Sequence, residues 1–354
     1  MTPFVRCLLV LILLPLINGC SSTRYYSQLA SGQWQLLKAR EPVADIIADP
    51  QRPAALRQQL AKAQAARTFA SQHLHLPDNA SYRLYADLKR PYVVWNVFAT
   101  PEFSLNPVTH CFAIAGCVAY RGYYTPGGAR GEAALQRQQG KDVYIGGVEA
   151  YSTLGWFDDP LLNSMLGWGD DRVAALIFHE LAHQQVYVKD DTAFNESFAS
   201  FVEQQGLRQW RAQQGLPPAD RHAARQNEQF VGLVLDTRER LQTLYAQPLP
   251  EPRLRELKAA EFERMRREYR QLRDQQWGAN PRFDAWIDAP MNNAKLLPFG
   301  LYERWVPAFA ALFKQNASQW PQFYAEVERV ARLAPEQRKA ALQSLMSSAA
   351  STSS

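Results

Sequence analysis

The sequence predicts an α+β fold that is mainly helical, with a modest mixed or antiparallel sheet packed on the helix that contains residues 179–183. Apolar residues recur three and four positions apart toward both ends of the chain, which indicates amphipathic helices. Between about Tyr82 and Tyr151, β-branched and aromatic residues are punctuated by Gly and Pro, which is typical of short strands. Apolar residues make up 47% of the 354 residues and charged residues 21%, so the chain can bury a large core.

The composition excludes several classes of protein. Lys and Arg exceed Asp and Glu by 39 − 34 = 5, and this small excess does not by itself support nucleic-acid binding, which needs clustered positive charge. We therefore expect no nucleic-acid partner. Four cysteines are too few for a disulfide scaffold, and the absence of a repeat of about 20–50 residues argues against a solenoid.

Residues 1–19 are predicted to be a signal peptide of the lipoprotein type. Residues 7–17 form an apolar run that is too short to span a bilayer but has the length of a signal-peptide core. Gly19 directly before Cys20 resembles a bacterial lipobox, which implies cleavage before Cys20 and lipidation of its thiol, and Ser21 resembles an outer-membrane address. We therefore expect an envelope protein anchored by lipid to the periplasmic face of the outer membrane. An ordinary cleaved signal peptide is the alternative.

Two further cysteines, Cys111 and Cys117, remain in the mature chain. In an exported protein, two cysteines six residues apart are candidates for one local disulfide. A loop that short gains little entropy from closure, so the bond would lock a turn rather than hold the fold together. Thiol chemistry or metal ligation is the alternative, and the absence of a CxxC spacing disfavours it.

The elements of the first half follow from local patterns. Residues 24–74 are predicted to be helical, and apolar residues such as Leu60 and Phe69 share one face of a helix that begins after Pro53. The remaining predicted elements are strands at residues 82–85 and 92–98, strands and turns within 112–124, a helix at 132–139 and a strand at 142–145.

The second half is predicted to be mainly helical. Two long helical patterns at residues 219–246 and 252–277 are separated by prolines, and their leucines can face one another in an antiparallel hairpin. The second arm carries eight Lys and Arg against five Asp and Glu between Arg253 and Asp274. We interpret it as a solvated, salt-bridged face rather than a surface for anionic lipid or another envelope polymer. Residues 298–345 are predicted to be helical again.

One motif carries chemistry. Residues 179–183 are His-Glu-Leu-Ala-His, within a stretch from residue 171 to residue 187 that lacks Gly and Pro and is predicted to be a helix. His179 and His183 are one turn apart on the same face, so both imidazoles can share one tetrahedral metal ion. Glu180 adjoins that face and can take a proton from a metal-bound water without being a ligand. The motif predicts a metal-assisted hydrolase. Two structural histidines without a metal are the alternative.

A third protein ligand is required, and Glu196 is the predicted one. Residues 190–192 end the first helix and start a second, which folds back beside it and brings Glu196 close in its first turns. The result is the His₂Glu set of catalytic zinc sites. Glu203 is the rival ligand, about 10 Å further along the second helix. The Gly and His of the metzincin extension are replaced by Val186 and Lys189, which disfavours that class.

Several segments resemble a family of bacterial predicted aminopeptidases whose members are typically lipoprotein-like and of the gluzincin type. The similarity covers nearly the entire mature chain, and the metal-binding positions show no departure from the family's pattern. The segments that carry it are residues 111–124, 146–160, 177–203, 290–294 and 305–309.

The resemblance implies a zinc-dependent peptidase. Together with the motif, it leads us to expect one Zn²⁺ per chain on His179, His183 and Glu196, with Glu180 as general base. Its partners are expected to be a peptide or protein substrate and the membrane that holds the lipid anchor. We predict an aminopeptidase. Two alternatives remain, an endopeptidase that acts on envelope proteins or cell-wall peptides and a non-catalytic envelope lipoprotein with a structural metal.

These predictions divide the chain into four segments. They are a signal peptide, a metallopeptidase core with N-terminal helices, sheet and metal-binding helix, a helical part that closes the cleft, and a disordered tail: residues 1–19, 20–215, 216–346 and 347–354.

The sequence defines the substrate-binding groups less clearly than the metal ligands. Glu149 is a candidate for the carboxylate that holds the ammonium group of an aminopeptidase substrate, and a simple strand end is the alternative. Asn292 and Asn293 either bind peptide backbone or cap a turn. Residues 142–148 or 92–98 are candidates for an edge strand that pairs with the peptide. The oxyanion donor is not assigned, and its candidates are Tyr120, Tyr123, Tyr124, Tyr151, Tyr187 and His222.

Overall fold

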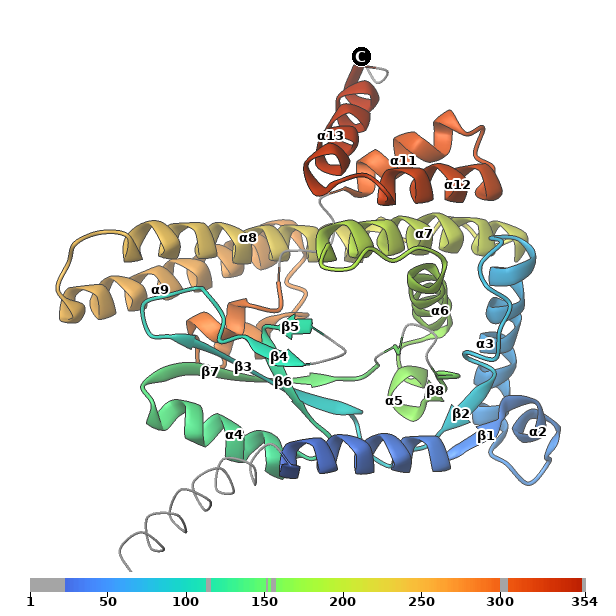
Figure 1. Ribbon diagram of the computed structural model, residues 1–354, viewed down its shortest axis with the longest axis horizontal. Helices are drawn as coiled ribbons and strands as arrows, with labels where there is room; N and C mark the ends of the chain where they lie inside the picture. Colours follow the sequence, from blue (N-terminus) through green and yellow to red (C-terminus); the bar gives the residue numbers. More distant parts are fainter. Residues whose placement is uncertain (1–22, 113–115, 151, 154–156, 300–304, 352–354) are drawn as a thin grey trace, which may run out of the picture.

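The computed structural model describes residues 23–112, 116–150, 152–153, 157–299 and 305–351, so the predicted signal peptide and Cys20 lie outside the described residues. The fold is α+β and mainly helical, as predicted. Three small sheets lie below the long helices α7 (Thr192–Gln213) and α8 (Arg221–Tyr245) in the view of Figure 1. Among the described residues, no helix combines the length and the hydrophobicity needed to cross a bilayer.

Local sequence signals explain the helices of the first half. α3 begins directly after Pro53, as predicted, and its Phe69 ring lies 5.9 Å from that of Phe178 in the main core. α4 begins at Pro126 rather than at Glu132, because the Thr125 hydroxyl accepts the N–H of Gly128 and proline fits the first turn. The helices, in order, are residues 23–38, α2 (Val43–Ala48), α3 (Ala54–Gln72), α4 (Pro126–Gln138), α5 (Asn163–Leu166) and α6 (Asp170–Gln185).

The central sheet is antiparallel. β3 (Val94–Pro101) lies in its middle, between β6 (Tyr120–Tyr123) and β7 (Lys141–Val148). The prediction that residues 92–98 could supply an edge strand is therefore wrong, since both edges of β3 are paired. β7 is an edge strand of this sheet, as predicted for residues 142–148.

One face of this sheet packs on α4, and not on α6 as the sequence suggests. Alternate apolar side chains of β3, among them Val97 and Ala99, meet Ala129 and Ala133 of α4 in one buried cluster. α6 instead packs mainly against α3 and α7. The reason is that β3 alternates in polarity only weakly, so the pattern of the strand does not reveal which helix covers it.

Two smaller sheets complete the β structure. β1 (Arg40–Pro42) pairs antiparallel with β2 (Leu84–Ala86), which pairs parallel with β8 (Leu161–Leu162). β4 (His110–Phe112) and β5 (Gly116–Val118) form a hairpin in which Cys111 and Cys117 are directly opposite and joined by a disulfide. The sequence pattern missed β1 and β8, which are too short to show an alternation.

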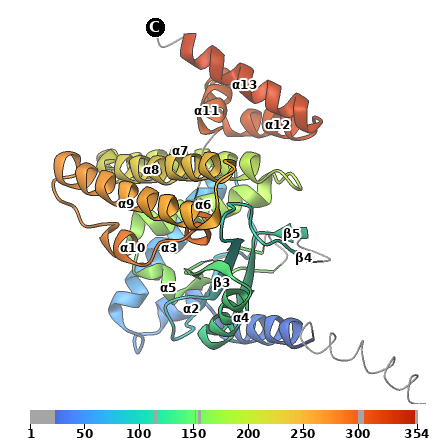
Figure 2. The same cartoon turned by 90° about the vertical axis from the view of Figure 1, so that its left-hand side faces the viewer.

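The second half is helical. α8 and α9 form the predicted antiparallel hairpin, with a core of its own that includes Phe230, Leu233, Phe262 and Met265 (Figure 2). The three last helices lie on α7, and α13 continues to Ser351, into the segment for which disorder was predicted. The elements after α8 are α9 (Glu251–Gln276), α10 (Asp284–Asp288), the 3₁₀ helix η1 (Asn293–Leu296), α11 (Val306–Gln315), α12 (Trp320–Ala331) and α13 (Pro335–Ser351).

The basic arm of the hairpin is laced by ion pairs. Arg264 of α9 contacts carboxylates of Asp236, Glu261 and Glu268 at 2.5–2.7 Å. Lys258 donates to Asp142 of β7 at 2.6 Å and thereby ties the hairpin to the central sheet. The arrangement agrees with the interpretation of this arm as a salt-bridged face.

Candidate metal centre

The turn between α6 and α7 brings the motif residues together. Asn195, buried in the first turn of α7, accepts the N–H of Val188 at 2.8 Å and donates to the Val188 carbonyl at 2.7 Å. Asp191 caps α7 by accepting the N–H of Phe194 at 3.0 Å, and its other oxygen accepts from Arg338 of α13 at 2.7 Å. These bonds fix the start of α7, where the next residue after Asn195 is Glu196.

The three predicted ligands converge on one point. Nε2 of His179 lies 3.2 Å from Nε2 of His183, and the carboxylate of Glu196 lies 3.4 Å from the first nitrogen and 3.7 Å from the second. Two ligands of a tetrahedral ion with bonds of about 2.0–2.1 Å are about 3.3 Å apart. The three side chains therefore have the donor chemistry and the spacing that a single metal ion requires.

Glu203 does not lie where an alternative third metal ligand would have to lie. Its Oε2 lies 2.9 Å from Nδ1 of His179, the ring nitrogen that faces away from the converging group. A carboxylate at this position fixes the tautomer and the orientation of a ligating imidazole. Glu203 is thus an orienting partner of His179. Nδ1 of His183, in contrast, is buried and has no hydrogen-bond partner among the described residues.

Substitution of Glu203 with Ala is expected to weaken metal binding about 10–100-fold, because the His179 ring loses its orienting carboxylate. Competition with a chromophoric chelator measures this affinity. Gln204→Ala is the matched control, since Gln204 is the exposed neighbour on the same helix and should retain full affinity. Equal affinities for the two variants would contradict the orienting role.

The charges of the protein groups favour a cation. Burial lowers the pKa of His179, but the hydrogen-bonded carboxylates of Glu196 and Glu203 outweigh it and raise that pKa to about 10. Burial and the charge of His179 lower the pKa of His183 to about 4. The carboxylates of Glu196 and Glu203 thus both face the His179 ring, and Glu196 also faces that of His183. A divalent cation bound between these groups would balance the negative charge of the Glu196 carboxylate in place of the proton on His179.

Glu180 is a half-buried carboxyl group beside the predicted ligands. Burial raises its pKa to about 7, the nearby charge of His179 opposes this rise, and the charges of Glu196 and Asp159 add to it. A carboxyl group with a pKa near the working pH can both accept and return a proton. The residue that the motif predicts as general base therefore has the electrostatic surroundings of one.

Two residues near Glu180 were not found by sequence reasoning. Asp159 is buried and accepts from Thr153 N–H and hydroxyl at 2.8 and 2.9 Å, and burial raises its pKa. Its backbone carbonyl accepts the N–H of Tyr82 at 2.6 Å, and the buried Tyr82 has a positive φ of 63°. Both residues lie in loops, where the spacing of residues in the sequence does not indicate which side chains come together. The positive φ of a bulky residue is visible only in the structure.

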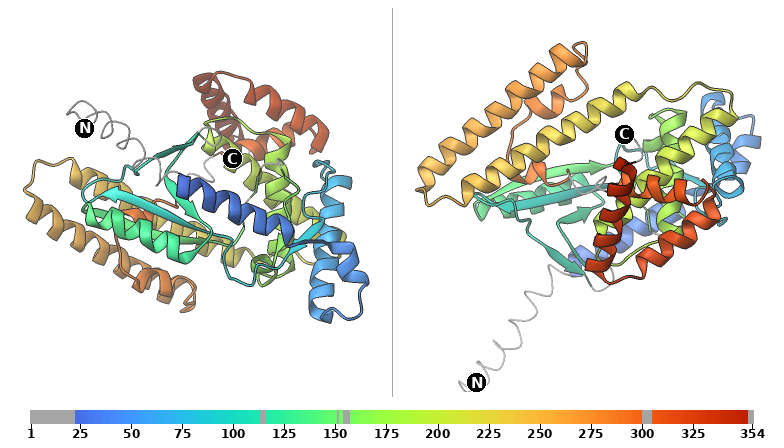
Figure 3. Two further views of the ribbon diagram at one scale, coloured as in Figure 1. Left: turned by 60° about the horizontal axis from the view of Figure 1, so that its bottom comes forward. Right: turned by 90° about the horizontal axis from the view of Figure 1, so that it is seen from above.

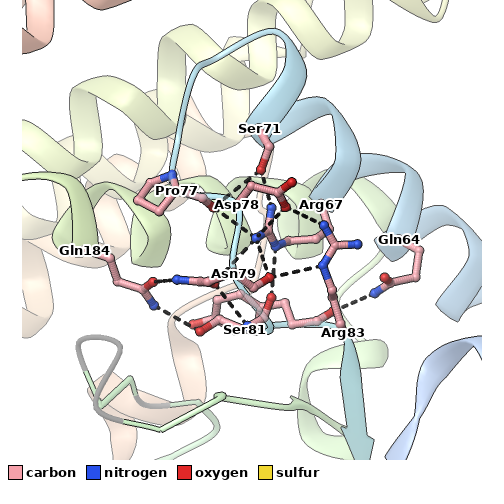
Figure 4. A network of polar contacts seen from close by, with 10 residues as sticks. Gln64, Arg67, Ser71, Pro77, Asp78, Asn79, Ser81, Arg83 and Gln184 are labelled. Atoms are coloured by element: carbon pink, nitrogen blue, oxygen red, sulfur yellow. Dashed lines mark hydrogen bonds and ion pairs between the residues drawn. The ribbon is translucent and has the colours of Figure 1, made fainter.

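A buried polar network fixes the loop after α3 to α6 beside His183 (Figure 4). The guanidinium of Arg67, which has no exposed surface, donates to the carbonyls of Ser81 and Asn79 at 2.9 Å each. Nδ2 of Asn79 then donates at 2.6 Å to Oε1 of Gln184, the residue that follows His183. The network therefore links the core of α3 to the helix that carries both histidines.

Arg67→Met is expected to lower the free energy of unfolding by about 3–5 kcal/mol, because several buried carbonyls would lose their donor. Urea denaturation followed by circular dichroism measures the loss. Arg332→Met is the control: its side chain is 78% exposed and pairs with Glu328 at the surface, so the expected loss is below about 1 kcal/mol. Similar losses for both variants would show that the network contributes no more than a surface ion pair.

The candidate oxyanion donors differ in their surroundings. The Tyr187 ring lies 6.3 Å from that of His183. Tyr120 is 37% exposed, and partial desolvation followed by the charge of Glu196 raises the pKa of its hydroxyl. Tyr123 and Tyr124 are instead buried, and their hydroxyls donate to Glu132 and Gln33.

The other candidates lie elsewhere. His222 is exposed at the start of α8, and Tyr151 lies outside the described residues. Asn292 donates to the carbonyl of Val143 and caps η1, and the buried Asn293 donates to two carbonyls of the turn after β3, so both hold η1 to the central sheet. The carbonyl of Glu149, just after β7, accepts from Ser164, and its side chain has no ion pair with the described residues.

Comparison with known proteins gives one match. No curated protein and no solved structure matches the chain significantly. The model of a protein family described as "putative aminopeptidase" matches residues 24–342, a span that contains the metal-binding cluster and Glu180. Because this match extends over most of the chain, the protein belongs to the putative aminopeptidase family.

Proposed function

We propose that this protein is a zinc-dependent peptidase, with His179, His183 and Glu196 as the metal ligands and Glu180 as general base. The observation that carries the proposal is the convergence of the three donor groups, 3.2–3.7 Å apart, beside the half-buried carboxyl group of Glu180. The family described as aminopeptidases supports the reaction class.

Each residue of the proposed site has its own role in the reaction. A Zn²⁺ ion held by the three ligands would act as a Lewis acid and lower the pKa of a water in the remaining position. Glu180 takes a proton from the attacking water and returns it to the nitrogen that leaves the peptide bond. Glu203 keeps His179 in the orientation in which Nε2 faces the metal.

The family description supports removal of N-terminal residues, which we propose as the activity. An endopeptidase is the second candidate, because β7 is an edge strand on which an extended peptide can pair. The two differ in their need for a free amino group. A peptide with a free N-terminus and its acetylated counterpart therefore distinguish them.

The test uses the mature chain from Ser21 onward. Elemental analysis is expected to find about one zinc per chain, and peptides with a free N-terminus are expected to be cleaved from that end while acetylated peptides are not. Equal cleavage of both peptides would replace the aminopeptidase by an endopeptidase. Absence of bound metal after supply of zinc would refute the metal-dependent mechanism.

We further propose that Cys20 is lipidated and holds the protein on the periplasmic face of the outer membrane. The support is the short apolar segment that ends at Gly19-Cys20. In a bacterial host, the wild type should fractionate with outer membranes and Cys20→Ser should be released as a soluble protein. A membrane-bound Cys20→Ser variant would contradict lipid anchoring.

A further inference from the structure

Large hydrophobic side chains are exposed on two neighbouring helices remote from the metal centre. Tyr26 and Trp34 on the helix over residues 23–38 are 51% and 59% exposed, and Leu135 on α4 is 56% exposed. Among the described residues, these are three of the four most exposed large hydrophobic side chains; the fourth, Tyr187, adjoins the metal centre. Exposed hydrophobic side chains that gather on one side of a molecule are typical of an interaction surface.

The two helices form one side of the molecule. Tyr25 of the first helix packs in the same buried cluster as Ala129 and Ala133 of α4. Both helices lie at the bottom of Figures 1 and 2, and both face the viewer in the left panel of Figure 3. The helices α11–α13 lie at the opposite, upper side in Figure 1. We call the exposed surface of residues 23–38 and α4 the basal face.

The charge of the basal face has one sign. Its exposed ionisable side chains are Arg24, Lys38, Arg130 and Arg137. Glu132 is the single acidic residue of the two helices, and it is buried and bonded to Tyr123 and Gln136. Lys38 Nζ lies 5.2 Å from the centre of the Trp34 ring, so a cation and an aromatic side chain share one spot on this surface.

We propose that the basal face lies on the lipid bilayer that carries the anchor, with Tyr26 and Trp34 in the interfacial layer. Only two residues separate Cys20 from the helix that starts at residue 23, a reach of about 10 Å. Trp and Tyr side chains favour the interface between lipid and water, and exposed Lys and Arg favour anionic headgroups. The inference rests on the proposed anchor at Cys20 and is independent of the peptidase activity.

The test measures how deep the basal face lies. The mature chain from Ser21 carries an N-terminal histidine tag and is tethered to vesicles of phosphatidylethanolamine and phosphatidylglycerol that contain a nickel-chelating lipid. A fluorophore is attached at Ala30→Cys, between Tyr26 and Trp34, or at Ala340→Cys on α13, both exposed positions. Cys111 and Cys117 are in a disulfide, so the introduced thiol is the reactive one. Lipid-attached nitroxide is expected to quench position 30 strongly and position 340 weakly.

A matched pair of double variants separates docking from simple closeness to the tether. Tyr26→Ser with Trp34→Ser should reduce the quenching at position 30 to the level at position 340 and leave hydrolysis of a soluble peptide unchanged. Leu216→Ser with Leu235→Ser removes two exposed leucines elsewhere and should change neither quantity. Equal quenching at position 30 with and without the aromatic side chains would overturn the proposal. So would a fluorescence change at position 30 that depends on protein concentration without vesicles, which would show a second copy on this face.

Because the tether replaces the natural lipid, the result does not depend on whether Cys20 is modified. If the protein is soluble in the cell but docks in this assay, the anchoring proposal is wrong and the docking proposal stands. Failure of docking in a protein that hydrolyses peptides would likewise leave the peptidase proposal intact.

Discussion

Glu180→Gln is expected to lower kcat for peptide hydrolysis about 10²–10⁴-fold while the zinc content stays near one per chain. The amide has the size of the carboxylate but cannot accept a proton from the attacking water. Steady-state kinetics with a free-amine peptide and elemental analysis of the same preparation measure the two quantities.

Asp170→Asn is the matched control for this substitution, because it also changes an acid to its amide on α6 but at an exposed position in the first turn. Its kcat should equal that of the wild type. Loss of zinc from Glu180→Gln would show that Glu180 is a ligand, and full activity of that variant would assign proton transfer to another group.

His183→Ala should reduce the zinc content from about one per chain to near zero and abolish hydrolysis. Only two of the three converging groups would remain, and two ligands do not form the site that a catalytic zinc requires. Zinc should also cease to raise the melting temperature. In the wild type, free zinc at about 1,000 times its Kd adds about 4 kcal/mol to the stability by mass action.

The control for His183→Ala is His222→Ala, which removes an exposed histidine at the start of α8. This variant should bind zinc and be stabilised by it as the wild type is. If His183→Ala still bound one zinc per chain, the metal would have to be elsewhere, and the assignment of all three ligands would be wrong.

Periodicity was sufficient to predict the long helices and the pair of histidines. α3, the hairpin of α8 and α9 and the helix of residues 179–183 each have a local pattern that tertiary contacts do not override. The short strands have no such pattern. β8 exists because two residues pair with β2, which precedes it by more than seventy residues, and no local signal encodes that contact.

In the candidate site, too, local patterns predict some features, and contacts between residues far apart in the sequence decide the others. Spacing places Glu196 and Glu203 on one helix, but their proposed roles as ligand and as orienting partner differ because each faces a different nitrogen of His179. Asp159 reaches the surroundings of Glu180 through a loop, so its position depends on the bonds that it makes to Thr153 and not on sequence distance.

The double role of Asp191 joins the metal centre to the end of the chain. One oxygen caps the helix that carries Glu196, and the other holds Arg338, almost 150 residues later and nearly buried. A protease that cut between α12 and α13 would therefore loosen a turn at the metal site without touching a ligand. Shortened forms of the chain that lack α13 are therefore expected to bind a metal ion less tightly than the full chain.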